Sequence, residues 1–217
     1  MLTVPWPLDR EDVFDVLATI RGGGLFVYPT ETVYGIGVAL SAGADGIERV
    51  RAAKRSPPGR PYILLAATTQ MAFSLWSDVP LVAQMLGWSE WPGPLTLIGR
   101  ARDGLPAGVL GSVQVPGADT MESVPTVSVR VPGDPALRQL ITRLGEPILS
   151  TSANLAGAPT PVAFTDLDLD ELAPDLVLKT ERCPGGIPST LLTIVEDPPR
   201  VLRQGAWRPK LEGEVQE

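Results

Sequence analysis

The chain has 217 residues, of which 44% are hydrophobic and 20% are charged, and its net charge is −7. Length and composition predict one soluble globular domain, and the acidic balance argues against a general nucleic-acid-binding protein. Since the chain contains no histidine and one cysteine, Cys183, it excludes Ser-His-Asp and Cys-His catalysis, an internal disulfide and a multi-cysteine zinc site. We therefore expect Cys183 to be a packing or loop residue.

The first nine residues lack the basic segment and following apolar segment of a secretory signal. No apolar run reaches the roughly 18 residues that a membrane-spanning helix needs. We therefore expect a cytoplasmic protein with no membrane partner.

Apolar periodicity and turn residues divide the chain into alternating helices and strands. Helices are predicted over 9–21, 44–53, 69–76, 80–86 and 134–144, and strands over 25–28, 62–66, 95–99, 126–131, 147–149, 176–179, 190–195 and 201–203. Residues 102–125 are rich in glycine and proline, which predicts a long loop with short extended pieces. The alternation predicts an α/β fold with one twisted mixed sheet flanked by helices.

A polar segment follows the strand predicted over 25–28. It reads Pro29-Thr30-Glu31-Thr32-Val33-Tyr34-Gly35-Ile36-Gly37. Gly35 and Gly37 permit backbone conformations that are closed to other residues. The loop can therefore present Thr30, Thr32 and backbone N–H groups to a polar or anionic ligand. The alternative is an ordinary connection between a strand and a helix.

A second polar segment, Ser150-Thr151-Ser152-Ala153-Asn154, comes directly after the strand predicted over 147–149. Four hydrogen-bonding side chains in five residues are costly to bury without partners. At the end of a strand, their hydroxyl, amide and backbone N–H groups can surround phosphate oxygens. The alternative is a helix cap or a turn cluster.

Basic residues gather between positions 48 and 60, where Glu48 is the single acid. They are Arg49, Arg51, Lys54, Arg55 and Arg60. The second half of this window lies between a predicted helix and a predicted strand, where a proline-rich turn can direct basic side chains inward. For Arg49 and Arg51 the alternative is the solvated face of their helix.

Further segments accompany these motifs in the order of a known family. They are Trp91-Pro92-Gly93-Pro94-Leu95-Thr96, Ser128-Val129-Arg130-Val131-Pro132 and Arg203-Gln204-Gly205-Ala206. From about Asp9 to Trp207, the chain resembles the YrdC-like family of threonylcarbamoyl-AMP synthases. The resemblance implies an α/β domain over 9–207 with an open concave cavity, and terminal extensions over 1–8 and 208–217. Longer members carry a further C-terminal domain after the Arg-x-Gly-Ala segment, whereas only eleven residues follow Ala206 here. We therefore expect the short single-domain form.

The family implies an ATP-dependent nucleotidyltransferase. L-threonine, bicarbonate and ATP would give threonylcarbamoyl-adenylate and pyrophosphate, the first step towards threonylcarbamoyladenosine (t6A) in tRNA. The implied cofactor is Mg²⁺ bound with ATP, without a metal site of the protein's own. Positioning and electrostatic stabilisation dominate such a reaction, so the lack of histidine is no obstacle. Other expected partners are proteins of the t6A pathway and, weakly and in a salt-dependent way, RNA.

The resemblance also assigns residues to the site. Thr30 and Thr32 would line the threonine site, where Lys54 reaches the carboxylate or the nearby phosphates. Lys54, Arg55 and Thr32 are the expected catalytic residues. The expected nucleotide-binding residues are Ser128, Arg130, Ser150, Ser152, Asn154, Ser189 and Arg203. The role of Glu31 stays open between a structural and a functional one.

The chain departs from the family pattern just after Lys54. Relatives commonly read Lys-x-Arg-Pro, whereas this chain reads Lys54-Arg55-Ser56-Pro57. We expect Arg55, or else Arg60, to replace the arginine missing at Ser56. The alternatives to a synthase are a non-catalytic RNA-binding module and a diverged paralogue with another carbamoyl acceptor.

Overall fold

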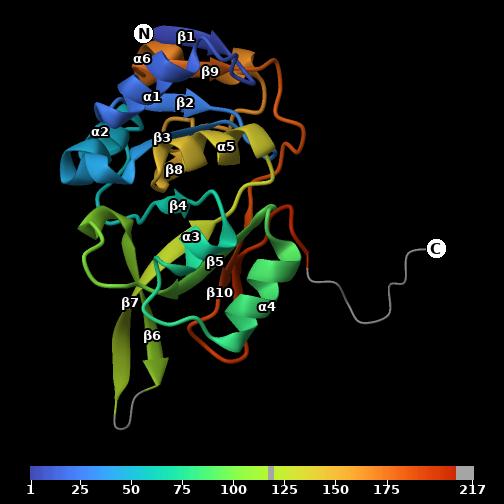
Figure 1. The fold of residues 1–217 in the computed structure, drawn as a ribbon. Coiled ribbons are helices and arrows are strands. Elements are labelled where there is room, and N and C mark those ends of the chain that lie inside the picture. The colour runs from blue at the N-terminus through green and yellow to red at the C-terminus, as the bar shows by residue number, and fades with distance from the viewer. Residues whose placement is uncertain (117–119, 209–217) are drawn as a thin grey trace.

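The computed structural model describes residues 1–116 and 120–208. In chain order its strands are β1 (Leu2–Pro5), β2 (Phe26–Tyr28), β3 (Gly35–Ala39), β4 (Ile63–Leu65), β5 (Leu95–Arg100), β6 (Leu110–Pro116), β7 (Met121–Arg130), β8 (Ile148–Ser152), β9 (Leu176–Lys179), β10 (Thr190–Thr193) and β11 (Arg200–Arg203). They form one mixed sheet in the order β1-β9-β2-β3-β8-β4-β7-β5-β10-β11, with β6 paired to β7. Figure 1 shows β1 and β9 at one end of the molecule and the β6–β7 hairpin extending from the other. The predicted α/β class with a mixed sheet is confirmed.

The α-helices are α1 (Val13–Arg21), α2 (Gly43–Ala53), α3 (Thr69–Phe73), α4 (Leu81–Glu90), α5 (Pro135–Leu144) and α6 (Leu169–Leu172). Helix α5 shows why such an element begins and ends where it does. The Asp134 carboxylate accepts the N–H of Leu137 at 2.9 Å, and Pro135 occupies the first turn. Gly145, with φ 88°, ends the helix in the left-handed conformation that favours glycine.

The helices are short compared with a bilayer. Within the described part of the chain, none combines the length and the apolar character needed to cross a membrane.

The two faces of the sheet carry separate hydrophobic cores. Helices α1 and α5 pack on one face, where Ile20, Leu137 and Ile141 are fully buried near Phe26 and Ile148. Burial of each such side chain stabilises the fold by about 1.5–3 kcal/mol. Helices α2, α3 and α4 contribute Val50, Ala72 and Ala83 to the core on the opposite face. Beyond α1 and α5 the first face is left open, and this opening becomes the candidate site.

Gly35 and Gly37 lie in strand β3, between β2 and β8, and not in a loop as the sequence predicted. A Cβ at Gly35 would lie 2.8 Å from the ring of Tyr28, and one at Gly37 would overlap the carbonyl oxygen of Leu149. Both glycines have the extended backbone of a strand, which any residue can adopt. Glycine is therefore required at these positions by close packing and not by backbone conformation.

Residues 102–125, predicted as a long loop with short extended pieces, contain β6 and the first half of β7. The two strands pair in antiparallel register from Leu110–Val127 to Pro116–Met121. Alternation in β6, where Val113 and Val115 are separated by Gln114, was the available signal. At the N-terminus, Leu2–Pro5 form β1, which pairs in parallel with β9 at the edge of the sheet.

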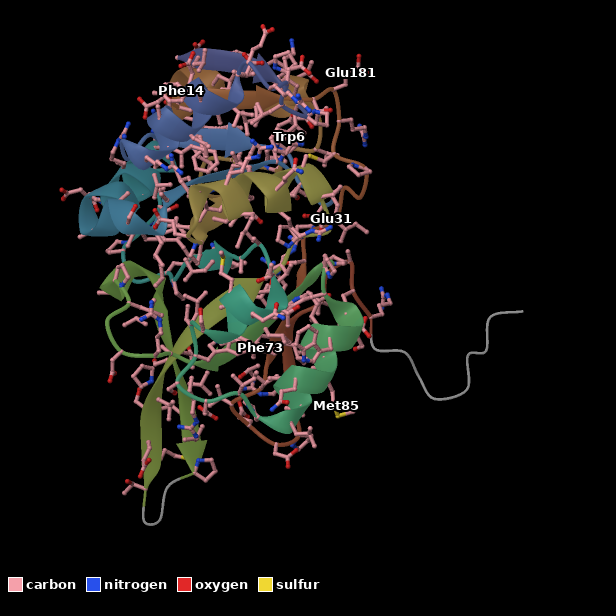
Figure 2. The ribbon with its side chains drawn as sticks, in the orientation of Figure 1. Trp6, Phe14, Glu31, Phe73, Met85 and Glu181 are labelled. Carbon is pink, nitrogen blue, oxygen red and sulfur yellow. The ribbon has the colours of Figure 1, made fainter. Side chains whose placement is uncertain are left out.

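Helix ends moved by a few residues from the prediction. Helix α1 begins at Val13 and not near Asp9, and α4 continues to Glu90. Met85 on α4 projects away from the body of the molecule (Figure 2), with 64% of its surface exposed.

Candidate functional site

The open part of the sheet face forms a cavity of about 840 Å³. Strands β3, β4, β5, β7 and β8 supply its floor, and residues 54–62, the start of β6 and the end of β11 supply its rim. Four cationic side chains line it: Lys54, Arg60, Arg130 and Arg203. None of the described lining residues is Asp or Glu. The cavity is therefore electrostatically suited to an anion.

Strand register sets hydroxyl groups in a row across the floor. Ser150 of β8 lies opposite both Gly37 of β3 and Ile63 of β4, and Ile63 lies opposite Ser128 of β7. Directly paired residues point to the same face of a sheet. Ser128 and Ser150 thus both face the cavity, two strand spacings or about 10 Å apart. This spacing suits an elongated ligand such as a chain of phosphates.

Thr30 organises the first polar loop. Its hydroxyl donates to the carbonyl oxygen of Val33 at 2.7 Å and accepts the N–H groups of Thr32 and Val33 at 3.0 and 3.1 Å. Its oxygen is also 2.7 Å from Oγ1 of Thr32. Both threonines line the cavity although they are 5% and 2% exposed. Thr30 therefore fixes the turn that presents Thr32.

Arg130 is buried, and its guanidinium joins three segments around the cavity. Its Nη2 pairs with Oε1 of Glu31, its Nη1 donates to Oγ1 of Thr32 at 3.2 Å, and its Nε donates to the carbonyl oxygen of Gly93 at 3.0 Å. Glu31 also accepts the N–H of Asp134 at 3.4 Å, and it lies beside α5 in Figure 2. Glu31 thus holds Arg130 in place, and the Gly93 turn forms part of the same wall.

Lys54 ends helix α2, and its side chain is buried. Nζ donates to the carbonyl oxygens of Ser152 and Asn154, the latter at 2.5 Å. Burial, and secondly the charge of Arg60, lowers the pKa of Lys54 to about 8. The ammonium therefore holds the segment after β8 against the cavity and still carries its charge at neutral pH.

The second polar segment forms the last residues of β8 and a closed loop. Oγ of Ser152 donates to Oδ1 of Asn154. Nδ2 of Asn154 donates to the carbonyl oxygens of Leu155 and Ala158 at 2.9 and 2.8 Å. Asn154 therefore fixes this loop at the edge of the cavity.

The structure separates Arg55 from the cavity. Arg55 has φ 50°, and this left-handed backbone turns its side chain towards α6, where its guanidinium pairs with Glu171. The Arg55 side chain is 67% exposed and is absent from the cavity lining, which includes Ser56 and Arg60. We therefore correct the expected position of Arg55: Arg60 is the arginine that this segment brings to the cavity.

Arg203 lies at the far wall. Its Nη2 donates to the carbonyl oxygen of Ser189 at 2.8 Å, and the Ser189 hydroxyl is 2.8 Å from Oγ1 of Thr96. Burial lowers the pKa of Arg203, with further lowering by the charges of Arg60 and Arg130. These mutually repelling cations are stabilised when an anion lies between them.

Sequence reasoning missed Thr126 as a cavity residue, and it missed the contact that Thr190 makes. Thr126 lines the cavity because it alternates with Ser128 and Arg130 along β7, a signal that the strand period contained. Thr190 donates to the carbonyl oxygen of Trp207 at 2.6 Å, which fixes the chain after β11. No local pattern predicts that contact, because it joins two separate segments.

The donor set around the cavity suits Mg²⁺ only as an ion bound to phosphate. The described residues contain no cluster of His, Cys, Asp or Glu that could hold a metal. The neutral oxygen atoms that the cavity floor offers are mainly serine and threonine hydroxyls.

The fold and the cavity define an α/β domain with a cationic cavity on an open sheet face. A family profile named Sua5_yciO_yrdC, with the description "Telomere recombination", matches residues 18–205. The chain belongs to this family, and the predicted resemblance is confirmed.

Relatives in this family differ in length and in name. A threonylcarbamoyl-AMP synthase of Pyrococcus abyssi is 32% identical, over 86% of this chain and 52% of its own length. The uncharacterized protein YciO of Escherichia coli is 30% identical, over 86% of this chain and 85% of its own length. The chain therefore spans about half of the Pyrococcus relative and most of YciO.

Solved structures agree with this assignment. The structure of P. abyssi Sua5 complexed with L-threonine superposes with a TM-score of 0.78 at 29% identity, covering 94% of this chain and 57% of that one. The structure of E. coli YciO gives a TM-score of 0.74 at 25% identity and covers 94% of both chains. The fold described above is thus the part that this chain shares with both proteins.

Proposed function

We propose that the protein is an L-threonylcarbamoyladenylate synthase. The observation that carries this proposal is the composition of the cavity. Aligned serines lie on its floor, four cationic side chains line it, and its described lining residues include no carboxylate. The name of the Pyrococcus synthase and the L-threonine bound in the P. abyssi Sua5 complex suggest the substrate.

The proposed reaction needs two bond-forming steps. The amine of threonine adds to the carbon of bicarbonate-derived CO₂ and loses a proton, which gives a carbamate. A carbamate oxygen then bonds to the α-phosphorus of ATP, and the bond to the β-phosphate oxygen breaks with release of pyrophosphate. Negative charge accumulates on the phosphates, so preorganised cations and hydroxyls are the groups that lower the barrier.

In this proposal, these groups act at two ends of the cavity. Thr32 and Lys54 stand at the end where we place the amino acid, and Lys54 adds the positive charge that a carboxylate requires. Ser128, Ser150 and Arg203 would meet the phosphates along the floor and far wall. Arg60 acts on both Lys54 and Arg203 through its charge and would bridge the two ends.

Mg²⁺ would arrive with ATP and neutralise phosphate charge. The residues fit this role only through the floor hydroxyls, since a carboxylate pair of the kind that holds Mg²⁺ by itself is missing from the described lining. An enzyme of tRNA modification would act in the cytoplasm and pass its product to other proteins of that pathway.

A direct assay tests the proposal. Purified protein is incubated with L-threonine, bicarbonate, ATP and Mg²⁺, and pyrophosphate and threonylcarbamoyl-adenylate are measured by coupled assay and mass spectrometry. We expect both products, and neither when threonine or bicarbonate is omitted. Thr32→Ala and Ser152→Ala should weaken the binding of threonine and ATP in calorimetry. Absence of binding of either ligand by the wild type would contradict the proposal.

The second candidate is a diverged paralogue with another carbamoyl acceptor. Ser56 in the cavity lining favours it, because relatives commonly have arginine at this position, and so does the extent of the match to YciO. If the wild type makes no threonylcarbamoyl-adenylate but Ser56→Arg does, this second candidate is the correct one. Nanomolar affinity for RNA at near-physiological salt would instead indicate an RNA-binding module.

A further inference from the structure

Tyr28 carries a polar group that the fold buries without using. The side chain is fully buried on the same face of the sheet as the cavity, and its hydroxyl has no hydrogen-bond partner among the described residues. A buried polar group that is left unpaired lowers stability, because it loses its hydrogen bonds to water and gains none in the protein. Phenylalanine would fill the same space without that cost, so the hydroxyl calls for an explanation.

The Tyr28 ring packs directly on the backbone of the two glycines of β3, Gly35 and Gly37. Tyr28 pairs with Gly35, and a Cβ at Gly35 would lie 2.8–2.9 Å from the ring carbons. A Cβ at Gly37 would lie 3.4 Å from the Tyr28 hydroxyl oxygen. Without side chains on β3, the ring crosses this strand towards β8, where Gly37 lies opposite Ser150.

Ser150 is the polar side chain next to the Tyr28 hydroxyl, because it is paired with Gly37. It lines the cavity and is 8% exposed, whereas the neighbouring phenol of Tyr28 is fully buried. Burial raises the pKa of Tyr28 far above its usual value, and this effect outweighs the lowering by the Ser150 hydroxyl, which is close to the phenol but outside hydrogen-bond geometry. The phenol therefore keeps its proton and remains a hydrogen-bond donor at every physiological pH.

We propose that Tyr28 is a positioning residue for Ser150: when an anion occupies the cavity floor, Oη of Tyr28 donates a hydrogen bond to Oγ of Ser150, which turns the Ser150 O–H towards an oxygen of the anion. A hydroxyl can accept one bond while it donates another. The two hydroxyls then form a chain of hydrogen bonds, a relay in which Tyr28 donates to Ser150 and Ser150 donates to an oxygen of the ligand. That the anion is the phosphate chain of ATP rests on the proposed function.

The test is a double-mutant cycle read by calorimetry with two probes, ATP and inorganic pyrophosphate. Tyr28→Phe keeps the ring and removes the donor. We expect it to weaken binding of both probes about fivefold to tenfold, where tenfold equals about 1.4 kcal/mol. In the Ser150→Ala background, Tyr28→Phe should have no further effect, whereas in the matched Ser152→Ala background its effect should persist.

Thermal unfolding of the free proteins separates positioning from packing. Tyr28→Phe should leave the midpoint unchanged or raise it, because it removes an unpaired buried group. Weakened binding that persists in the Ser150→Ala background, or unchanged binding of both probes, overturns the proposal. Binding of pyrophosphate without ATP supports the relay and contradicts the proposed synthase, and failure of the wild type to bind either probe contradicts both.

Discussion

The floor and the rim of the cavity are built in different ways. The floor consists of strand residues whose positions follow from register, so that Ser150, Ile63 and Ser128 stand in one row. The rim segment 54–61 contains three prolines, a glycine with φ 86° and Arg55 with φ 50°. A substitution in the floor disturbs the fold and the site together, whereas a substitution of an exposed rim residue, unlike one of the buried Lys54, changes the ligand contacts alone. The comparison predicts a graded set of effects.

Gly37→Ala should have the largest effect, because its Cβ would overlap the carbonyl oxygen of Leu149 in a central strand pair. We expect a loss of about 4 kcal/mol or more in the free energy of unfolding, beyond ordinary overpacking. Chemical denaturation measures it. The control is Gly22→Ala at the end of α1, where φ is −72° and the nearest atom is 3.3 Å away. Equal stability of the two variants would contradict the packing role of Gly37.

Arg130→Met should destabilise the fold by about 3 kcal/mol, since it leaves Glu31 without its buried partner. The Glu31 side chain is 21% exposed, which keeps the expected loss at the lower end of the range for such pairs. The double variant Arg130→Met with Glu31→Gln should recover part of the stability. If the double variant is no more stable than the single one, the ion pair is not what holds this wall.

Two arginines of the rim should differ in ligand binding and not in stability. Arg60→Ala should weaken ATP binding about tenfold, or about 1.4 kcal/mol, because it removes a cation of the cavity lining. Arg55→Ala should change it less than about twofold, since its pair with Glu171 is exposed and such pairs contribute little. Calorimetry at one fixed salt concentration measures both. A larger loss for Arg55→Ala would reverse our assignment.

The pH dependence of anion binding should show the smallest effect. Because the pKa of Lys54 is about 8, its charge is lost as pH rises through this value, and anion affinity should fall severalfold between pH 7 and pH 9. In Lys54→Arg the fall should vanish in this range.

Stability should respond to the same titration with the opposite sign. Between about pH 8 and the unfolded value of 10.5 the unfolded chain binds more protons at Lys54, so this contribution to the free energy of unfolding increases with pH. If both the anion affinity and the stability of the wild type fall across this range, and neither falls in Lys54→Arg, the assigned pKa of Lys54 is contradicted.

Local pattern and family resemblance together identified most of the floor but little of the rim. Ser150 was identified because polar residues at the end of a strand break an otherwise apolar pattern, whereas Ser128 and Arg130 were assigned by the resemblance to the family. The same pattern missed β3, since Gly35 and Gly37 have low strand propensity and their role is set by the Tyr28 ring above them. That contact is tertiary, and no window of sequence contains it.

The direction of Arg55 was beyond the sequence for a different reason. The φ and ψ angles of a turn residue decide where its side chain points. Arg55 has a left-handed backbone, so its side chain points away from the cavity that the side chain of Lys54 faces. Glu171, which receives the Arg55 side chain, lies more than a hundred residues away. Charge counting predicted a basic window correctly, but it did not tell which cation of the window faces inward.

The strand order has a consequence for how the protein is made. Strand β1 has β9 as its neighbour, β9 separates it from β2, and β8 separates β3 from β4, so strands synthesised late fill gaps between strands synthesised early. A nascent chain that ends before β8 exposes unpaired apolar strand edges, which favour aggregation. Because Arg203 belongs to the last strand, the cationic lining of the cavity is completed only after nearly all of the described chain has left the ribosome.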